Sequence, residues 1–245
     1  MSDAEWWSGS PVAVADELVA AQRRAWWDVS GPGTWWSGAE RLAIAEVARD
    51  ALDDPDPLPP WVAPSSVEGR VDVGGRIPAV AVDVAHRIAG APGTLTDEWY
   101  RTALAGGLTE GHYVELVAVV VRVAAIDTFA RVTGMHPPPF GPARAGEPRR
   151  RRPSAARVDR HWVPTIRPDA APPELDWLYD GGGAPNVLRA LTMVPDELRA
   201  LRPLQAAGYV PGEHLMDVTW DRGGLDRRQI ELLAARTSVV NECFY

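Results

Sequence analysis

The residue best suited to chemistry in this sequence is Cys243, the only cysteine in the chain. It lies in the segment Asn-Glu-Cys-Phe-Tyr, and Glu231 precedes it by twelve residues. A thiol and a carboxylate form a useful pair for redox or nucleophilic chemistry, because the thiolate is the reactive form of cysteine and a carboxylate can accept the proton that it loses. The pair can act only if the fold brings the two groups together.

Helix geometry decides whether Glu231 and Cys243 can meet. In one continuous helix, positions twelve apart differ by about 120° around the axis, so the two side chains would not share a face. Thr237 is a weak helix former and Asn241 is a favoured N-cap. We therefore expect one helix to end near Val240 and another to begin at Asn241. Cys243 would then lie in a first helical turn, where free N–H groups and the helix dipole favour a thiolate, and Glu231 could approach the sulfur.

The apolar period of the chain is helical nearly everywhere, and no convincing alternating strand is found, so the sequence predicts an all-α protein. Ser37 and Glu40 have the spacing of a capping box at the start of a helix. Thr109 is expected to cap a long helix that runs to Val132 and ends at Gly134. Further helix starts are predicted at residues suited to capping or to a first turn: Pro78, Asp196 and Asp226. Pro203 is expected to bend or shorten the helix that Asp196 begins and Gly208 ends.

Residues 135–172 differ in composition from the rest, because they are rich in proline and arginine. The arginines at 149–152 could contact RNA or a phosphate, or they could keep a solvated linker extended. The net charge of −8 favours the second interpretation. We therefore divide the chain into a first unit at 1–134, a linker at 135–172 and a second unit at 173–245.

The segments on the two sides of this linker resemble each other. Residues 107–129 align with residues 223–244, and each has a Gly-Leu turn, a polar cap, Glu-Leu and an apolar run. Asp127 follows Glu115 by twelve residues, as Cys243 follows Glu231. The pattern indicates an internal duplication in which the first copy has no thiol and is chemically degenerate.

The segment RRQIELLAARTSVVNECFY resembles the core of the alkylhydroperoxidase D-like and carboxymuconolactone decarboxylase-like superfamily, whose pattern is Glu, eleven residues, Cys-x-x-Cys and then His. WWSGAERLAIAEVARDAL and APNVLRALTMVPDELRALRPL are similar to its longer, two-unit peroxidase-related members. The resemblance implies an AhpD-like helical fold, homo-oligomers, and thiol peroxidase or disulfide reductase activity on hydroperoxides. It implies a dithiol or lipoyl-type electron donor and no cofactor. Glu231 matches the family's proton-relay glutamate and Cys243 its first motif cysteine.

The same resemblance implies a second redox residue at position 246, followed by a histidine. Selenocysteine occurs there in some members, and it is encoded by UGA, so we interpret residue 246 as selenocysteine, with Cys243 as its resolving partner. A shortened chain or a nonsense mutation are the alternatives, and the codon after Tyr245 distinguishes them. We expect little or no turnover from these 245 residues alone.

Composition restricts the partners and the compartment. A single cysteine fits a reducing cytoplasm, and the acidic balance predicts no nucleic-acid partner. The longest apolar stretch, residues 114–125, is interrupted by Glu115 and Arg122 and is too short for a bilayer. The five histidines show no ligand spacing, so no metal site is predicted. His214 could approach the thiol, although a surface role is favoured.

Two other classes of protein remain open. A decarboxylase-like or isomerase-like enzyme on the same fold would not need Cys243. A non-catalytic helical scaffold would leave that thiol unreactive. The adjacent tryptophan pairs could line an apolar pocket, but packing between helices or subunits is favoured for them: Trp6-Trp7, Trp26-Trp27 and Trp35-Trp36.

Overall fold

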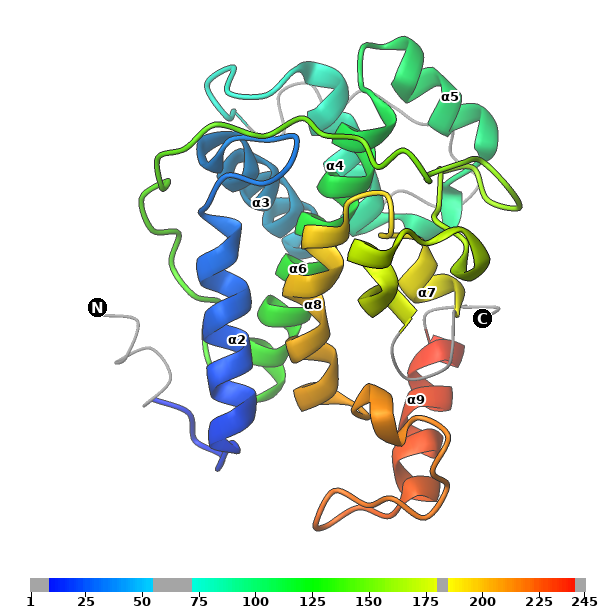
Figure 1. Cartoon of the computed structure of the whole chain (residues 1–245). Coiled ribbons are helices and arrows are strands. Elements are labelled where there is room, and N and C mark those ends of the chain that lie inside the picture. Colours follow the sequence, from blue (N-terminus) through cyan, green and yellow to red (C-terminus); the bar gives the residue numbers. More distant parts are fainter. Residues whose placement is uncertain (1–8, 55–71, 180–184, 241–245) are drawn as a thin grey trace.

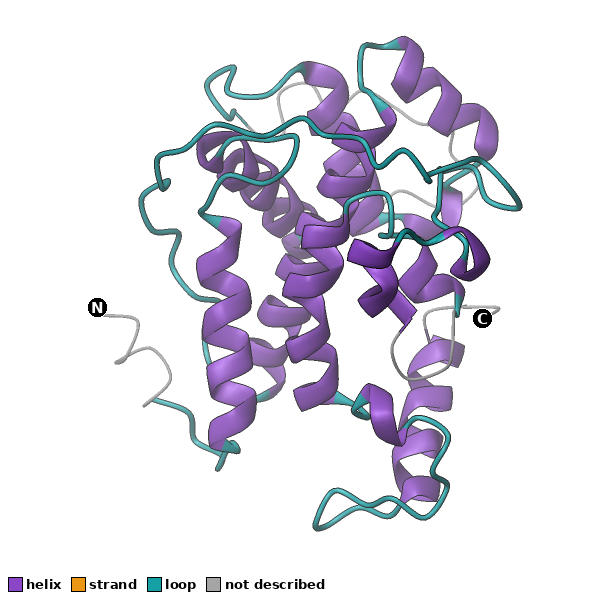
Figure 2. Cartoon of the chain, viewed as in Figure 1, coloured by secondary structure: helices purple, strands orange, loops and turns teal. Residues whose placement is uncertain are grey.

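The computed structural model describes residues 9–54, 72–179 and 185–240. All regular structure in these ranges is helical, apart from one isolated bridge between Arg157 and Thr165, and this confirms the all-α prediction (Figure 2). Short 3₁₀ turns connect some of the helices. The α-helices are α2 (Asp16–Val29), α3 (Gly38–Asp53), α4 (Ala79–Gly90), α5 (Asp97–Ala105), α6 (Glu110–Val132), α7 (Asn186–Arg189), α8 (Pro195–Gly208) and α9 (Arg227–Val240).

The long helix α6 lies at the centre of the molecule. Its buried residues cover most of its circumference and leave one exposed stripe, which is typical of a helix packed against several others: Val121, Ala125, Thr128 and Val132. Helices α3, α4, α2 and α8 pack against it, and α2 and α8 lie side by side (Figure 1). One apolar core extends from α2 through α3, α4 and α6 to α8. Helix α8, which follows the linker in sequence, therefore shares a core with helices that precede the linker.

Three predicted helix caps are confirmed, and each forms hydrogen bonds with a residue three positions away. The Ser37 hydroxyl accepts the backbone N–H of Glu40, whose carboxylate in turn accepts the N–H of Ser37, so the capping box is complete. The Thr109 hydroxyl accepts the backbone N–H of His112 at the start of α6. Asp226 and Gln229 bind each other's backbone N–H groups with both distances at 2.9 Å, directly before α9.

Two predicted helix starts are wrong by one or two residues. Pro78 is the N-cap of α4 rather than its first helical residue. Asp196 does not cap α8, because Pro195 occupies the first helical position, where its missing N–H has no consequence. Asp196 instead lies in the first turn and binds arginine side chains. Helix α8 also continues through Pro203 and is not shortened there.

Most of the segment 135–172 crosses the surface as an irregular chain, drawn in green over α2, α3 and α4 (Figure 1). It is attached to the helical body by backbone hydrogen bonds. Arg144 N–H donates to Ser30 O at 2.8 Å, and Arg150 N–H donates to Thr34 O at 2.6 Å. The division into two related units remains a prediction.

Within the described ranges, no helix combines the length and the apolar character that crossing a bilayer requires.

Candidate functional site

Glu231 lies one turn into α9 and is anchored through one carboxylate oxygen. Its Oε1 accepts the Tyr209 hydroxyl at 2.8 Å and Arg227 Nε at 2.7 Å. Its Oε2 accepts no hydrogen bond from the described residues, and the side chain is 45% exposed. The carboxylate is thus held in one orientation while its second oxygen stays open to another partner.

The surroundings of Glu231 favour its ionised form. The hydrogen bond from Tyr209, more than the nearby Arg227, lowers the pKa of the Glu231 carboxyl. Burial, together with the same hydrogen bond, raises the pKa of the Tyr209 hydroxyl, so this group stays a neutral donor. At neutral pH the site therefore presents a carboxylate that can accept a hydrogen bond or a proton.

Arg227 ties the start of α9 to the preceding loop. Its Nη1 donates to the carbonyl oxygens of His214 at 3.0 Å and Asp217 at 3.1 Å, and its Nη2 donates to Leu215 O at 2.8 Å. The ring of His214 stacks on Trp220 with centroids 5.6 Å apart. Arg227 therefore fixes both Glu231 and the loop beneath it.

Cys243 and Asn241 lie outside the described residues. Helix α9 is continuous through Thr237, whose hydroxyl donates to the Leu233 carbonyl one turn earlier, and on to Val240. A helix break after Val240, and the approach of Glu231 to Cys243, remain predictions.

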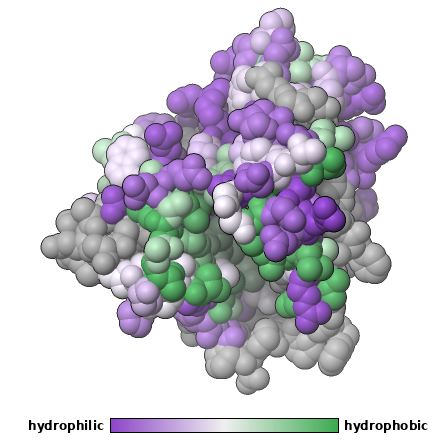
Figure 3. Space-filling view, turned by 90° about the horizontal axis from the view of Figure 1, so that it is seen from below, coloured by the Kyte–Doolittle hydropathy of each residue, from purple (hydrophilic) through white to green (hydrophobic). Residues whose placement is uncertain are grey.

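Helix α9 packs only lightly on the rest of the molecule. Ile230 is the one residue of Arg227–Val240 that is buried. Four of its apolar side chains are more than half exposed: Leu232, Leu233, Val239 and Val240. Seen from below, apolar side chains flank a hollow in this face of the molecule (Figure 3). The helix that carries Glu231 thus leaves apolar surface uncovered.

The matching positions in the first segment have a different, structural use. Glu115 and Asp127 are both fully buried on α6, which is unbroken between them. Glu115 accepts Arg41 Nη1 at 2.7 Å and the backbone N–H of Trp35 at 2.6 Å. Asp127 binds Arg49 with both oxygens, at 2.6 and 2.8 Å. Neither carboxylate is open in the way that Glu231 is.

Glu115 belongs to a group of four charged side chains buried between α3, α6 and α8, which we call the buried ionic cluster. Its other members are Arg41, Arg122 and Glu197, and none is more than 4% exposed. Glu197 Oε1 lies 2.6 Å from Arg41 Nη1, and Glu197 Oε2 contacts Arg122 Nη2. The sequence reasoning missed this cluster. The signal that was present is the pair Glu115 and Arg122 inside an otherwise apolar stretch.

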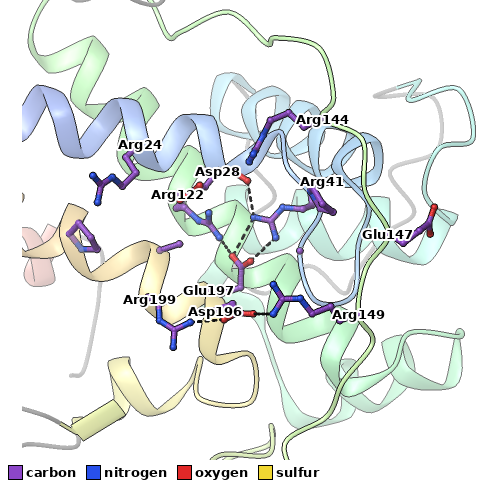
Figure 4. A pocket seen from close by; sticks show the side chains of 14 residues that line it. Arg24, Asp28, Arg41, Arg122, Arg144, Glu147, Arg149, Asp196, Glu197 and Arg199 are labelled. Carbon is purple, nitrogen blue, oxygen red and sulfur yellow. Dashed lines mark hydrogen bonds and ion pairs between the residues drawn. The ribbon is translucent and has the colours of Figure 1, made fainter. Parts of the chain in front are cut away.

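A cavity of about 530 Å³ opens beside the buried ionic cluster, between α2, α6, α8 and the linker (Figure 4). We call it the arginine pocket, because six arginines and four carboxylate residues line it. The arginines are Arg24, Arg41, Arg122, Arg144, Arg149 and Arg199, and the acids are Asp28, Glu147, Asp196 and Glu197. Guanidinium groups therefore outnumber carboxylates on its wall.

Comparison with known proteins gave no match to a family model, to a curated protein or to a solved structure. The resemblance of the last helix to the alkylhydroperoxidase D-like core therefore remains a prediction, and the function has to be argued from the geometry of the sites.

Proposed function

We propose that the chain is a thiol, or thiol–selenol, peroxidase and disulfide reductase that acts on hydroperoxides, with Cys243 in the redox pair and Glu231 as its proton relay. The observation that carries the proposal is the open oxygen of Glu231. Tyr209 and Arg227 occupy Oε1 and leave Oε2 for another partner. A positioned carboxylate of this kind can take a proton from a thiol that comes within hydrogen-bond reach.

The proposed cycle has three steps: oxidation of the second chalcogen, formation of the bridge with Cys243, and reduction of that bridge. A hydroperoxide gives one oxygen to the second chalcogen of the pair, the O–O bond breaks, and an alcohol or water leaves. Cys243 then loses its proton to Glu231 and attacks the oxidised chalcogen, which releases hydroxide; Glu231 returns the proton to form water. A dithiol or lipoyl-type donor reduces the resulting bridge by thiol exchange and is itself oxidised to a disulfide.

Because Cys243 is the only cysteine, alkylation by iodoacetamide reports on one thiol. An ionised carboxylate beside a thiol disfavours the thiolate. We therefore expect Glu231→Gln to lower the apparent pKa of Cys243 by about one unit and to speed alkylation near neutral pH. The same substitution should slow peroxide turnover, because the proton relay is lost. Opposite effects on alkylation and turnover would not result from simple misfolding.

Turnover is measured with a hydroperoxide and a dithiol reductant, on the 245 residues and on a chain extended by a second redox residue after Tyr245. We expect Cys243→Ser to abolish cycling in the extended chain. Glu213→Gln removes an exposed carboxylate from the loop before α9 and serves as the control for charge. An unchanged alkylation profile in the Glu231 variant, or full turnover in Cys243→Ser, would refute the proposal. The second result would favour a decarboxylase-like enzyme.

The partners of this activity are a hydroperoxide, a dithiol or lipoyl-type donor and a second copy of the chain. The exposed leucines and valines of α9 support the homo-oligomer, because contiguous apolar surface commonly marks an interface. Sedimentation equilibrium tests this partner: we expect an oligomer that Leu232→Glu together with Leu233→Glu dissociates, and a monomeric wild-type chain would contradict it.

A further inference from the structure

The arginine pocket combines a buried charged floor with a more accessible mouth. Arg41 and Arg122 reach the floor from α3 and α6, and both point toward Glu197 on α8 (Figure 4). Arg24 on α2, Arg199 on α8, and Arg144 and Arg149 on the linker surround the mouth. The pocket therefore draws its cations from elements that are distant in sequence.

Arg122 is the least satisfied group on the floor. It is fully buried, and its Nε donates only to the Ala118 carbonyl of its own helix, at 3.4 Å. Its Nη2 contacts Glu197, whereas its Nη1 has no hydrogen-bond partner among the described residues. Glu197 is also shared with Arg41, which lies 2.6 Å away. A buried guanidinium with an open donor is costly unless an anion or acceptor compensates for it.

The electrostatics agree with this geometry. Burial, and then repulsion by Arg41, lowers the pKa of the Arg122 guanidinium to about 9. A lowered pKa means that the charged form of the group is disfavoured in the folded chain, here mainly by burial. A negative charge placed beside Arg122 would favour its charged form.

At the mouth of the arginine pocket, too, two arginines share one carboxylate. Arg149 and Arg199 share the single carboxylate of Asp196, at 3.3 and 2.8 Å. The Arg144 guanidinium lies over the Trp27 ring, 3.3 Å from its centroid. Exposed ion pairs contribute little to stability, so Arg149 and Arg199 can turn toward a ligand at small cost.

We propose that the arginine pocket binds a small molecule that carries phosphate or carboxylate groups, with its oxygens hydrogen-bonded to Arg122 Nη1 on the floor and to the arginines of the mouth. Planar guanidinium groups match these anions with paired hydrogen bonds. The volume of about 530 Å³ is that of a small-molecule site. Four carboxylates on the same wall can accept hydrogen bonds from hydroxyl groups of such a ligand and discriminate against a bare halide.

Calorimetric titration of the 245-residue chain with inorganic phosphate and with citrate, at constant ionic strength set by chloride, tests the proposal. The pocket variant is Arg24→Gln with Arg149→Gln, two exposed substitutions that leave the buried ionic cluster intact. Arg101→Gln is the matched control, because Arg101 is an exposed arginine on α5 that does not line the arginine pocket. Far-ultraviolet circular dichroism checks that all variants are folded.

We expect saturable binding of at least one anion, about tenfold weaker in the pocket variant and unchanged in the control. Binding of phosphate alone would indicate a phosphorylated ligand, and binding of citrate alone a carboxylic acid. The proposal is overturned if neither anion binds above the chloride background, or if the pocket variant binds as the control does. The Glu231→Gln variant should bind the anion as the wild type does. A failure of anion binding would therefore not count against the peroxidase proposal, and the reverse also holds.

Discussion

At the scale of single residues, Glu197 links two arginines of the buried ionic cluster. Among the described acids, it is the one that forms ion pairs with both Arg41 and Arg122. Removing one partner of a buried ion pair leaves uncompensated charge in a low dielectric and costs about 3–5 kcal/mol. We expect Glu197→Ala to lower the free energy of unfolding by about this amount in urea titrations.

The neighbouring residue supplies the control for this prediction. Asp196→Ala removes a carboxylate that also contacts two arginines, but all of these side chains are well exposed. Its loss should cost less than about 1 kcal/mol, because surface ion pairs are screened by water. Similar losses for the two substitutions would show that burial of the cluster has no energetic importance.

Tyr100 gives a prediction about alkaline pH. Its ring is buried edge-on against Tyr113, and its hydroxyl has no hydrogen-bond partner among the described residues. Burial, more than the nearby acids Glu110 and Asp97, raises the pKa of the Tyr100 hydroxyl from 10.0 to about 12. A raised pKa in the folded state means that stability is complete below pH 10 and is lost as the pH rises toward 12.

Tyr100→Phe removes this titration and leaves no buried acceptor unpaired. The variant should match the wild type in urea unfolding near pH 9, and exceed its stability by about 1 kcal/mol near pH 11. Equal losses for both chains between these pH values would contradict the assignment of alkaline sensitivity to Tyr100.

At the scale of elements, the start of α3 depends on the capping box of Ser37. The Ser37 hydroxyl and the Glu40 carboxylate satisfy two backbone N–H groups that would otherwise lack partners. Ser37→Ala should destabilise the chain by about 1 kcal/mol in urea unfolding. Ser154→Ala, an exposed serine in the linker, should change stability by less than about 0.5 kcal/mol. A neutral Ser37 variant would mean that tertiary packing alone sets the start of α3.

Elements defined by local chemistry could be predicted from the sequence, whereas the buried ionic cluster could not. Three helix caps form hydrogen bonds to a residue only three positions away, so a short sequence pattern is enough to predict them: Ser37, Thr109 and Asp226. Arg41, in contrast, meets Glu115 and Glu197 across 74 and 156 residues. No periodic pattern encodes such pairings, because they follow from how the helices pack.

Gly33 shows how a loop adapts to that packing. A Cβ atom at this position would collide with Glu115 Oε1 and Arg41 Nη1. At Gly33 the loop before α3 can therefore pass this close to the buried ionic cluster because the residue lacks a side chain. In the sequence this glycine is one of several near prolines and tryptophans, and nothing local distinguishes it.

At the scale of the whole molecule, α8 joins the parts of the chain on either side of the linker. It packs against α2 and α6, and it brings Leu198, Leu201 and Leu204 into the core that α3 and α4 share. It also supplies Glu197 to the buried ionic cluster. Separating α8 from the earlier helices would expose apolar surface, deprive the buried Arg122 of its carboxylate and leave Arg41 with Glu115 alone.

This arrangement predicts that the two parts stay together after the linker is cut. A site for a sequence-specific protease, inserted between the exposed residues Arg150 and Arg151, allows one defined cleavage. We expect the two fragments to co-elute in gel filtration under native conditions and to separate in urea, because buried apolar contacts and ion pairs hold them independently of the backbone. The uncleaved chain is the control. Separation without denaturant would instead support two units that fold independently, as the internal duplication alone would suggest.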